Sequence, residues 1–94
     1  MRVLPQISVS TTDTKYELTG SKIVIVKAGT TAVLVSLGHL KGIKDGDTYT
    51  IPANTTYKFT SEKGRLFYCL WCYVSSGTST LDVAESNDDV ELIQ

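Results

Sequence analysis

The chain has 94 residues, of which 41% are hydrophobic and 20% charged, and its formal net charge is −1. This length corresponds to one domain, and the composition is that of a folded protein and not of a disordered one. Nine basic against ten acidic residues give no excess positive charge for binding phosphates, so we expect no nucleic-acid partner. No apolar run reaches the roughly 18–20 residues that a membrane span needs, so we expect no membrane partner.

The residue types favour strands over helices. Thirteen Thr, nine Val, six Ile, five Tyr, two Phe and one Trp suit a half-buried pleated surface, whereas only four Ala are present. No stretch sustains the apolar spacing of i, i+3, i+4 and i+7 that indicates an amphipathic helix. We therefore predict an all-β chain with little or no helix, a short helical turn being possible only around residues 39–43 or near the C-terminus.

Turn signals rich in Gly, Asp, Asn and Pro recur about every 8–12 residues, the spacing typical of a sandwich or barrel of short strands. The runs between them predict about eight strands, in chain order at residues 3–9, 15–18, 23–27, 32–37, 48–51, 56–60, 65–74 and 80–84. We expect a two-sheet antiparallel sandwich or jelly roll that occupies residues 1–94 as a single domain. Its ends, residues 1–13 and 85–94, are expected either to order on contact with a neighbour or to fray.

The predicted strands are of two kinds. Residues 48–51, 56–60 and 80–84 alternate apolar and polar side chains, which indicates one solvated face. Residues 23–26 and 66–74 are apolar on both faces, whereas a two-layer sandwich covers only the inner face of each sheet. We therefore expect another copy or a different protein to cover the outer faces, or alternatively a long loop of the chain itself. The candidate interface residues are Ile23, Ile25, Phe67, Trp71 and Tyr73.

Cys69 and Cys72 have the C-x-x-C spacing of some metal and redox sites. The predicted strand at 65–74 puts their Cα atoms about 10 Å apart and their side chains on opposite faces. A disulfide requires Cα atoms within about 7 Å, and His39 is the only histidine available as a further metal ligand. We interpret both cysteines as small buried hydrophobic residues and expect no cofactor.

His39 and the Asp45-Gly46-Asp47 segment are the remaining candidates for chemistry. His39 lies between glycines in a predicted loop, but no nucleophile motif accompanies it, so we interpret it as a surface histidine. The Asp-Gly-Asp segment has two of the carboxylates of a calcium loop but lacks the later ligands, and a tight turn explains it more simply. We therefore predict no catalytic, cofactor-binding or metal site, and no enzymatic activity.

Three segments carry a resemblance to a known class of proteins. DTYTIPANTTYKF at 47–59, GRLFY at 64–68 and SGTSTLDV at 76–83 resemble small β-sandwich structural proteins of tailed bacteriophage virions. The resemblance implies a non-enzymatic capsid decoration, cement or fibre-associated protein, made in the host cytoplasm and located on the capsid exterior or in the tail or fibres. Its partners would be itself, as a homotrimer, and major capsid or other virion proteins.

The aromatic residues of 67–73 leave an alternative function open. Trp71 and the nearby tyrosines could stack on sugar rings, as in a carbohydrate-binding β-sandwich module with exposed aromatics. Such a platform needs its aromatics on one exposed face. In the predicted strand Phe67, Trp71 and Tyr73 share one face and Tyr68 lies on the other, a pattern that favours core and interface packing.

Overall fold

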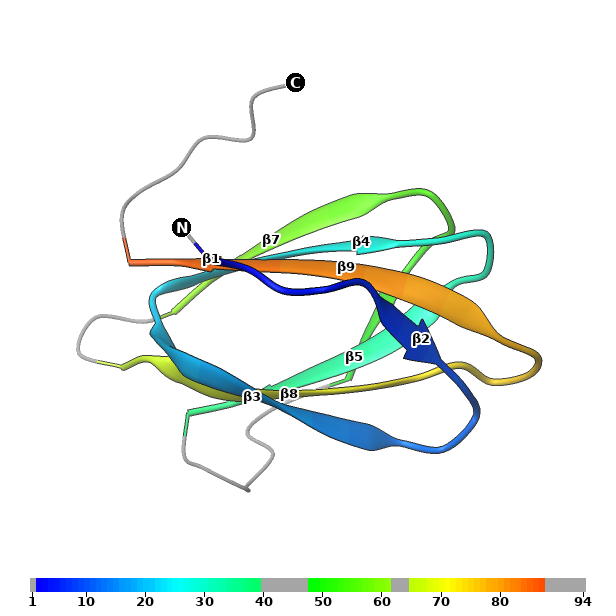
Figure 1. Ribbon diagram of the computed structural model, residues 1–94, viewed down its shortest axis with the longest axis horizontal. Coiled ribbons are helices and arrows are strands. Elements are labelled where there is room, and N and C mark those ends of the chain that lie inside the picture. Colours follow the sequence, from blue (N-terminus) through cyan, green and yellow to red (C-terminus); the bar gives the residue numbers. More distant parts are fainter. Residues whose placement is uncertain (1, 40–47, 62–64, 88–94) are drawn as a thin grey trace.

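The computed structural model describes residues 2–39, 48–61 and 65–87, and within this part the regular structure is all β-strand. In chain order the strands are β1 (Arg2–Val3), β2 (Ile7–Val9), β3 (Thr14–Ser21), β4 (Ile23–Ala28), β5 (Val33–Gly38), β6 (Tyr49–Ile51), β7 (Thr56–Thr60), β8 (Phe67–Tyr73) and β9 (Ser79–Ser86). They form two antiparallel sheets that pack face to face (Figure 1), which confirms the predicted all-β sandwich. The described residues contain no helix with the length and apolar character to cross a membrane.

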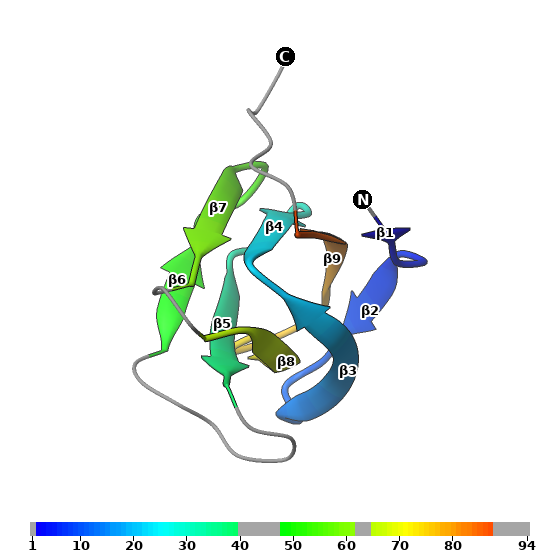
Figure 2. The same cartoon turned by 90° about the vertical axis from the view of Figure 1, so that its left-hand side faces the viewer.

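The strand order is that of a jelly roll. The first sheet has the order β2-β9-β4-β7, with β1 also pairing to β9, and the second sheet has the order β3-β8-β5-β6. The pairs are nested along the chain, because β2 pairs with β9, β3 with β8, β4 with β7 and β5 with β6. The chain thus resembles one long hairpin wrapped into two sheets. In the end view, β6 and β7 lie on one side of the sandwich and β2 and β3 on the other (Figure 2).

Several strand ends differ from those expected by one or two residues, and two larger differences change the strands themselves. The predicted strand at 3–9 is divided into β1 and β2, because Pro5 between them has no N–H to donate to a continuous ladder. The turn expected at Gly20 lies inside β3, where the register with β8 shifts between Glu17 and Ser21. Gly20 has a φ of 93°, a conformation that L side chains rarely adopt, and it forms the irregularity in the strand.

The core lies between the sheets and is built from alternate residues of the central strands. Eight side chains of the core cluster that are larger than alanine and at most 2% exposed come from β4, β5, β8 and β9, namely Val24, Val26, Val33, Val35, Leu70, Cys72, Leu81 and Val83. Burying a side chain of this size contributes about 1.5–3 kcal/mol. A register slip of one residue would turn these side chains toward the outer faces, so the core fixes the strand pairing.

The outer faces of β4 and β8 are sheltered more than expected within a single chain. Ile23 is 3% exposed and Cys69 0%, and Ile25, Trp71 and Tyr73 are half-buried. The exposed large hydrophobic side chains of the described residues are Val3, Tyr49 and Tyr57, all of which lie in strands at the borders of the sheets. Exposed apolar surface is therefore concentrated at the edges of the sandwich and not on its two broad faces.

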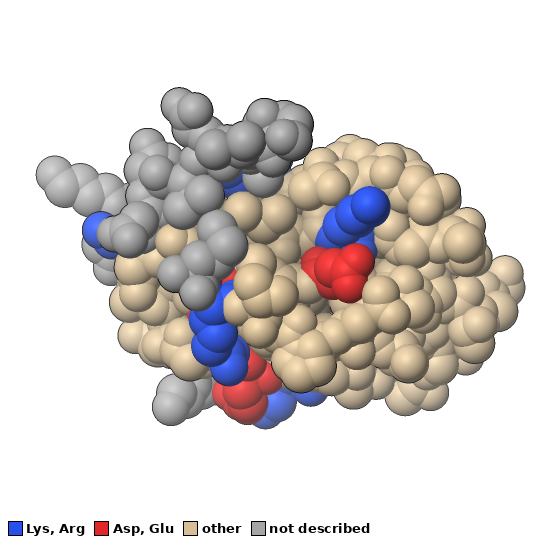
Figure 3. Space-filling model, turned by 45° about the horizontal axis from the view of Figure 1, so that its top comes forward, with Lys and Arg blue, Asp and Glu red and all other residues tan. Residues whose placement is uncertain are grey.

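Charged side chains are sparse on the face that Figure 3 shows, where the top of Figure 1 is turned forward. Two small groups on this face contain basic and acidic side chains next to one another, and most of the remaining surface outside the grey region is uncharged (Figure 3). Mixed charge of this kind produces no extended field of one sign.

Candidate functional site

An aromatic cluster occupies the side of the sandwich where β6 and β7 lie next to each other (Figure 2). The rings of Tyr49 in β6 and Tyr57 in β7 both pack on Phe59 in β7, with centroid distances of 5.2 and 6.3 Å. Tyr49 is 45% and Tyr57 38% exposed, whereas Phe59 is partly buried against the core. We call these three residues the aromatic edge.

Cross-strand register explains why the three rings meet. Tyr57 and Phe59 lie opposite core valines of β4, and Tyr49 lies opposite a core valine of β5. Residues directly opposite each other in an antiparallel pair share a face, so the three side chains point toward the gap between the sheets. The aromatic edge therefore covers the core at its open side and leaves part of each tyrosine exposed.

Both strands of the aromatic edge are border strands. Within the described ranges 2–39, 48–61 and 65–87, β7 pairs with β4 and β6 pairs with β5, and neither has a partner strand on its other side. A border strand presents backbone N–H and C=O groups with which an added strand can pair. Exposed aromatic rings beside two such strands are suited to binding an extended segment of a protein.

Lys58 adds a positive charge in the middle of β7. It lies opposite Ile25 of β4, and alternation turns its side chain away from the aromatic edge toward the outer face. A charge on a border strand disfavours pairing with strands that carry the same charge at that position. A strand that adds to β7 therefore needs a neutral or acidic residue opposite Lys58.

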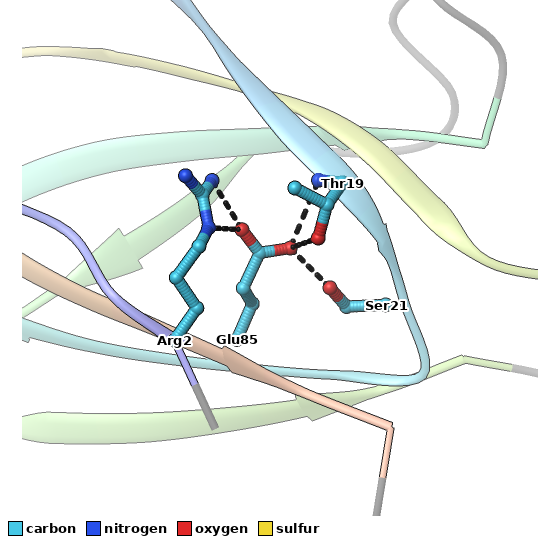
Figure 4. Close-up of polar contacts among 4 residues, drawn as sticks. All are labelled: Arg2, Thr19, Ser21 and Glu85. Atoms are coloured by element: carbon cyan, nitrogen blue, oxygen red, sulfur yellow. Dashed lines mark hydrogen bonds and ion pairs between the residues drawn. The ribbon is translucent and has the colours of Figure 1, made fainter.

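A buried carboxylate lies where β1, β9 and β3 meet (Figure 4). Glu85 of β9 is 2% exposed, and its Oε1 accepts hydrogen bonds from the Thr19 backbone N–H at 3.0 Å, the Thr19 hydroxyl at 2.9 Å and the Ser21 hydroxyl. Its Oε2 is bonded to the guanidinium of Arg2. Because these partners belong to β3 and β1, the carboxylate links the two sheets and holds the first strand in place.

The environment of Glu85 stabilises its charged form. Burial alone would raise the pKa of this carboxyl, but the hydrogen bonds from Ser21, Thr19 and Arg2 outweigh burial and hold the pKa below its ordinary value. A general acid needs a proton to give near neutral pH, and Glu85 is ionised there with both oxygens engaged. The arrangement indicates a structural role for Glu85.

The five interface residues expected from the sequence lie in three separate places. Ile23 and Ile25 are on the outer face of the first sheet, and Trp71 and Tyr73 are on the outer face of the second sheet. Phe67 is 6% exposed and belongs to the core cluster. The structure does not bring these residues into one patch, and their part in an interface stays a prediction.

His39, predicted to be a surface loop residue, is half-buried directly after β5. Its ring stacks on Phe67 with a centroid distance of 4.9 Å, and its Nδ1 lies 3.0 Å from the Leu66 carbonyl oxygen. The imidazole thus packs against the beginning of β8. This contact indicates a role in packing.

The two cysteines lie on β8 as the sequence predicted. Both are buried and form no disulfide, with Cys72 in the core cluster and Cys69 on the opposite face of the strand. Burial raises the pKa of Cys72 to about 12, which keeps this thiol protonated and unreactive. In the part of the chain that the structure describes, no group of three or more His, Cys, Asp or Glu is placed to hold a metal. The Asp45-Gly46-Asp47 segment lies outside the described residues.

Sequence reasoning did not identify the aromatic edge. The alternating pattern assigned Tyr49, Tyr57 and Phe59 to the apolar faces of two strands, and the register confirms that assignment. The pattern does not reveal that these strands come from different sheets and meet at one side of the sandwich. That proximity follows from the nested pairing of β4 with β7 and β5 with β6, which is a property of the whole fold.

No known family can be attached to this geometry by similarity. The aromatic edge and the Glu85 network are accordingly interpreted from their own residues. Comparisons of the chain with protein-family models, with curated protein sequences and with solved structures found no match.

Proposed function

We propose that this protein is a non-enzymatic structural component of a tailed-bacteriophage virion, a capsid decoration or cement protein or a fibre-associated protein. It acts through contacts with copies of itself, forming a homotrimer, and with major capsid or other virion proteins. The supporting observation is the aromatic edge, where Tyr49 and Tyr57 are exposed beside two border strands. Aromatic residues are enriched at the centres of protein interfaces, where few side chains carry most of the binding energy.

Two further observations support the proposal. All three residues of the aromatic edge fall within segment 47–59, the longest of the segments that resemble phage structural proteins. The jelly-roll strand order also occurs in viral capsid proteins, although lectin domains share it. Because one fold serves many functions, the fold supports the proposal without selecting between these two classes.

The experiment that tests the proposal is a measurement of solution mass by size-exclusion chromatography with light scattering. The full chain is expected to form a trimer or other stable oligomer. Replacing both tyrosines, as Tyr49→Ser with Tyr57→Ser, is expected to weaken association about 100-fold, because each removes an aromatic contact. Val3→Ser is the matched control, since Val3 is 71% exposed but lies in β1, at the other border of the first sheet.

The control variant is expected to keep the oligomeric mass of the full chain. A full chain that stays monomeric at every concentration and binds no virion protein would contradict the proposal. So would an oligomer whose mass is unchanged in the double tyrosine variant.

Carbohydrate binding is the second candidate function. The observation that favours it is again the exposure of Tyr49 and Tyr57, because sugar rings can stack on aromatic faces. Trp71, the aromatic residue first considered for this role, is half-buried between Lys15 and Ser36 of the neighbouring strands. A glycan array probed with the full chain separates the two functions. Specific binding that is lost in the double tyrosine variant would support the sugar site, and the absence of signal from an oligomeric chain would support assembly.

A further inference from the structure

We infer that β7 accepts the C-terminal segment of a second copy of this chain as an added antiparallel strand, with Glu91 of that copy opposite Lys58. The inference rests on the proposed assembly role and names the partner of the aromatic edge. Residues 88–94 lie outside the described part of the chain, and the inference rests on their sequence together with the geometry of β7.

The acceptor strand presents an alternating pattern along its open border. Tyr57 and Phe59 point toward the gap between the sheets, and Lys58 between them points to the outer face. An added strand with the complementary pattern would place apolar residues beside the two rings and a carboxylate beside the ammonium group. It would extend the first sheet and cover the exposed side of the aromatic edge.

The C-terminal segment has this complementary pattern. Val90-Glu91-Leu92 places an acidic residue between two apolar ones, in a segment where 85–94 carries four acidic residues and no basic one. In an antiparallel pair with Glu91 opposite Lys58, Val90 and Leu92 fall opposite the two aromatic residues of β7. A slip of one residue would put an apolar side chain opposite the lysine and an acidic one opposite a ring. The ammonium group has three donors, so Glu91 can join the contacts that Lys58 already makes.

The register of the first sheet shows that the segment cannot come from the same chain in this arrangement. Ser86 and Thr60 both lie level with Ile23, and the open side of β7 is three strand spacings from β9, about 14 Å at about 4.8 Å each. In the proposed pairing Val90 lies opposite Phe59, which is one residue along the strand direction from the level of Ser86. The distance from Ser86 to Val90 would therefore be about 15 Å. The four residues that lead from Ser86 to Val90 span at most about 13–14 Å when fully extended, which is too short. The path would also have to turn over the ends of β4 and β7, so the donor is a neighbouring copy.

Such a contact joins two different surfaces of identical chains. Each copy would donate its C-terminal segment to one neighbour and accept a segment from another at its own β7. Head-to-tail contacts of this type close into rings or continue as filaments, depending on the rotation between copies. A ring of three copies would be the trimer of the proposed function.

Charge reversal at the two paired positions tests the inference. Lys58→Glu and Glu91→Lys each convert an attractive cross-strand pair into a repulsive one, and each is expected to weaken self-association of the full chain about tenfold. The double variant Lys58→Glu with Glu91→Lys restores the opposite charges and is expected to recover association. An equimolar mixture of the two single variants is expected to recover it in part, since two of the three contacts in a mixed ring of three then join opposite charges. Sedimentation velocity at matched concentrations measures all four samples.

A second variant makes the outcome independent of charge. The chain truncated after Asn87 retains all nine strands and is expected to remain folded, as judged by circular dichroism, but to be monomeric. Unchanged association in both single variants and in the truncated chain would overturn the inference. Recovery in the double variant, with no gain in the mixture over either single variant, would also overturn it, because it would place the pair within one chain.

The results separate this inference from the proposed function. If the double tyrosine variant disrupts the oligomer while truncation leaves it intact, the aromatic edge binds something other than the C-terminal segment, and only the inference fails. If the full chain is monomeric throughout, both fail.

Discussion

At the scale of single residues, the Glu85 network carries the most polar interactions on one buried group. Removing a carboxylate from water costs several kcal/mol unless its oxygens are well bonded. Donors from Arg2, Thr19 and Ser21 supply that compensation, and among the described residues no buried side-chain N or O lacks a partner. Loss of the carboxylate would therefore leave the Ser21 hydroxyl buried without this partner, which is the costly outcome.

Replacing Glu85 by Gln is expected to lower the free energy of unfolding at neutral pH by about 2–3 kcal/mol. It is also expected to make the free energy of unfolding depend less on pH in the acid range. The pKa of the folded state lies below the ordinary value of 4.5. The carboxylate thus contributes stability that is fully present above that value and is lost as the pH falls through the folded pKa. The Gln variant has no such group to titrate. Urea denaturation at several pH values between neutral and about pH 3 measures the difference.

Glu17→Gln is the control for this experiment. Glu17 is a carboxylate on the surface of β3, 3.2 Å from Lys15, and surface ion pairs contribute little to stability. The control should keep the acid dependence of the unmodified chain. An acid dependence that Glu85→Gln leaves unchanged would show that this carboxylate does not stabilise the fold as described.

In most strands the sequence predicted which side chains point toward the core, but it did not predict the role of Glu85. Alternation correctly placed Leu81 and Val83 inside and Asp82 outside. Glu85 was placed in the terminal segment 85–94, which was expected to order on contact with a neighbour or to fray. The available signal was its position, since residue 85 continues the inward alternation of 81 and 83. Its four hydrogen bonds depend on β3 and β1, which the local sequence does not reveal.

At the scale of elements, the irregularity in β3 is what shapes the Glu85 network. Thr19 and Ser21 flank Gly20, whose φ of 93° accompanies the register shift against β8. This local bend lets both flanking residues donate to the same carboxylate oxygen. The glycine therefore contributes to the link between the sheets as well as to the course of its own strand.

Gly20→Ala is expected to lower the free energy of unfolding by about 2–4 kcal/mol, from the strained φ and from steric overlap together. A Cβ at position 20 would lie 2.9 Å from Tyr68 Cε1. Gly77→Ala is the matched control, because Gly77 also has a positive φ, 74°, but has nothing within 4 Å of an added Cβ. Thermal unfolding compares the two variants. Equal destabilisation would show that contacts around Gly20 add nothing to the cost of its backbone conformation.

The positions of the strands along the chain were largely predictable from the sequence, whereas the pairing between strands was not. Period-two alternation and turn residues located the strands, and the one division that was missed occurs at Pro5, where a proline inside a predicted strand was the signal. Strand order depends on which segments pair across the whole chain. The sequence pattern therefore placed candidate interface residues on β4 and β8, while the exposed aromatic rings lie on β6 and β7.

At the scale of the whole molecule, a closed core is bordered by the open side that β6 and β7 form. The two sheets and the Glu85 network hold the sandwich together, and the outer faces of its central strands are largely sheltered within one chain. The side formed by β6 and β7 combines exposed tyrosines with unextended border strands. An assembly role through that side is the central claim.

Amide hydrogen exchange of the full chain, measured at protein concentrations below and above those at which it associates, tests this claim most directly. Border strands without a partner exchange quickly, and an added strand protects them. We expect exchange in β7, residues 56–60, to slow as association proceeds, while exchange in β1 and β2 at the other border stays constant. Association that leaves β7 exchange unchanged, or that protects β1 and β2 instead, would contradict the account.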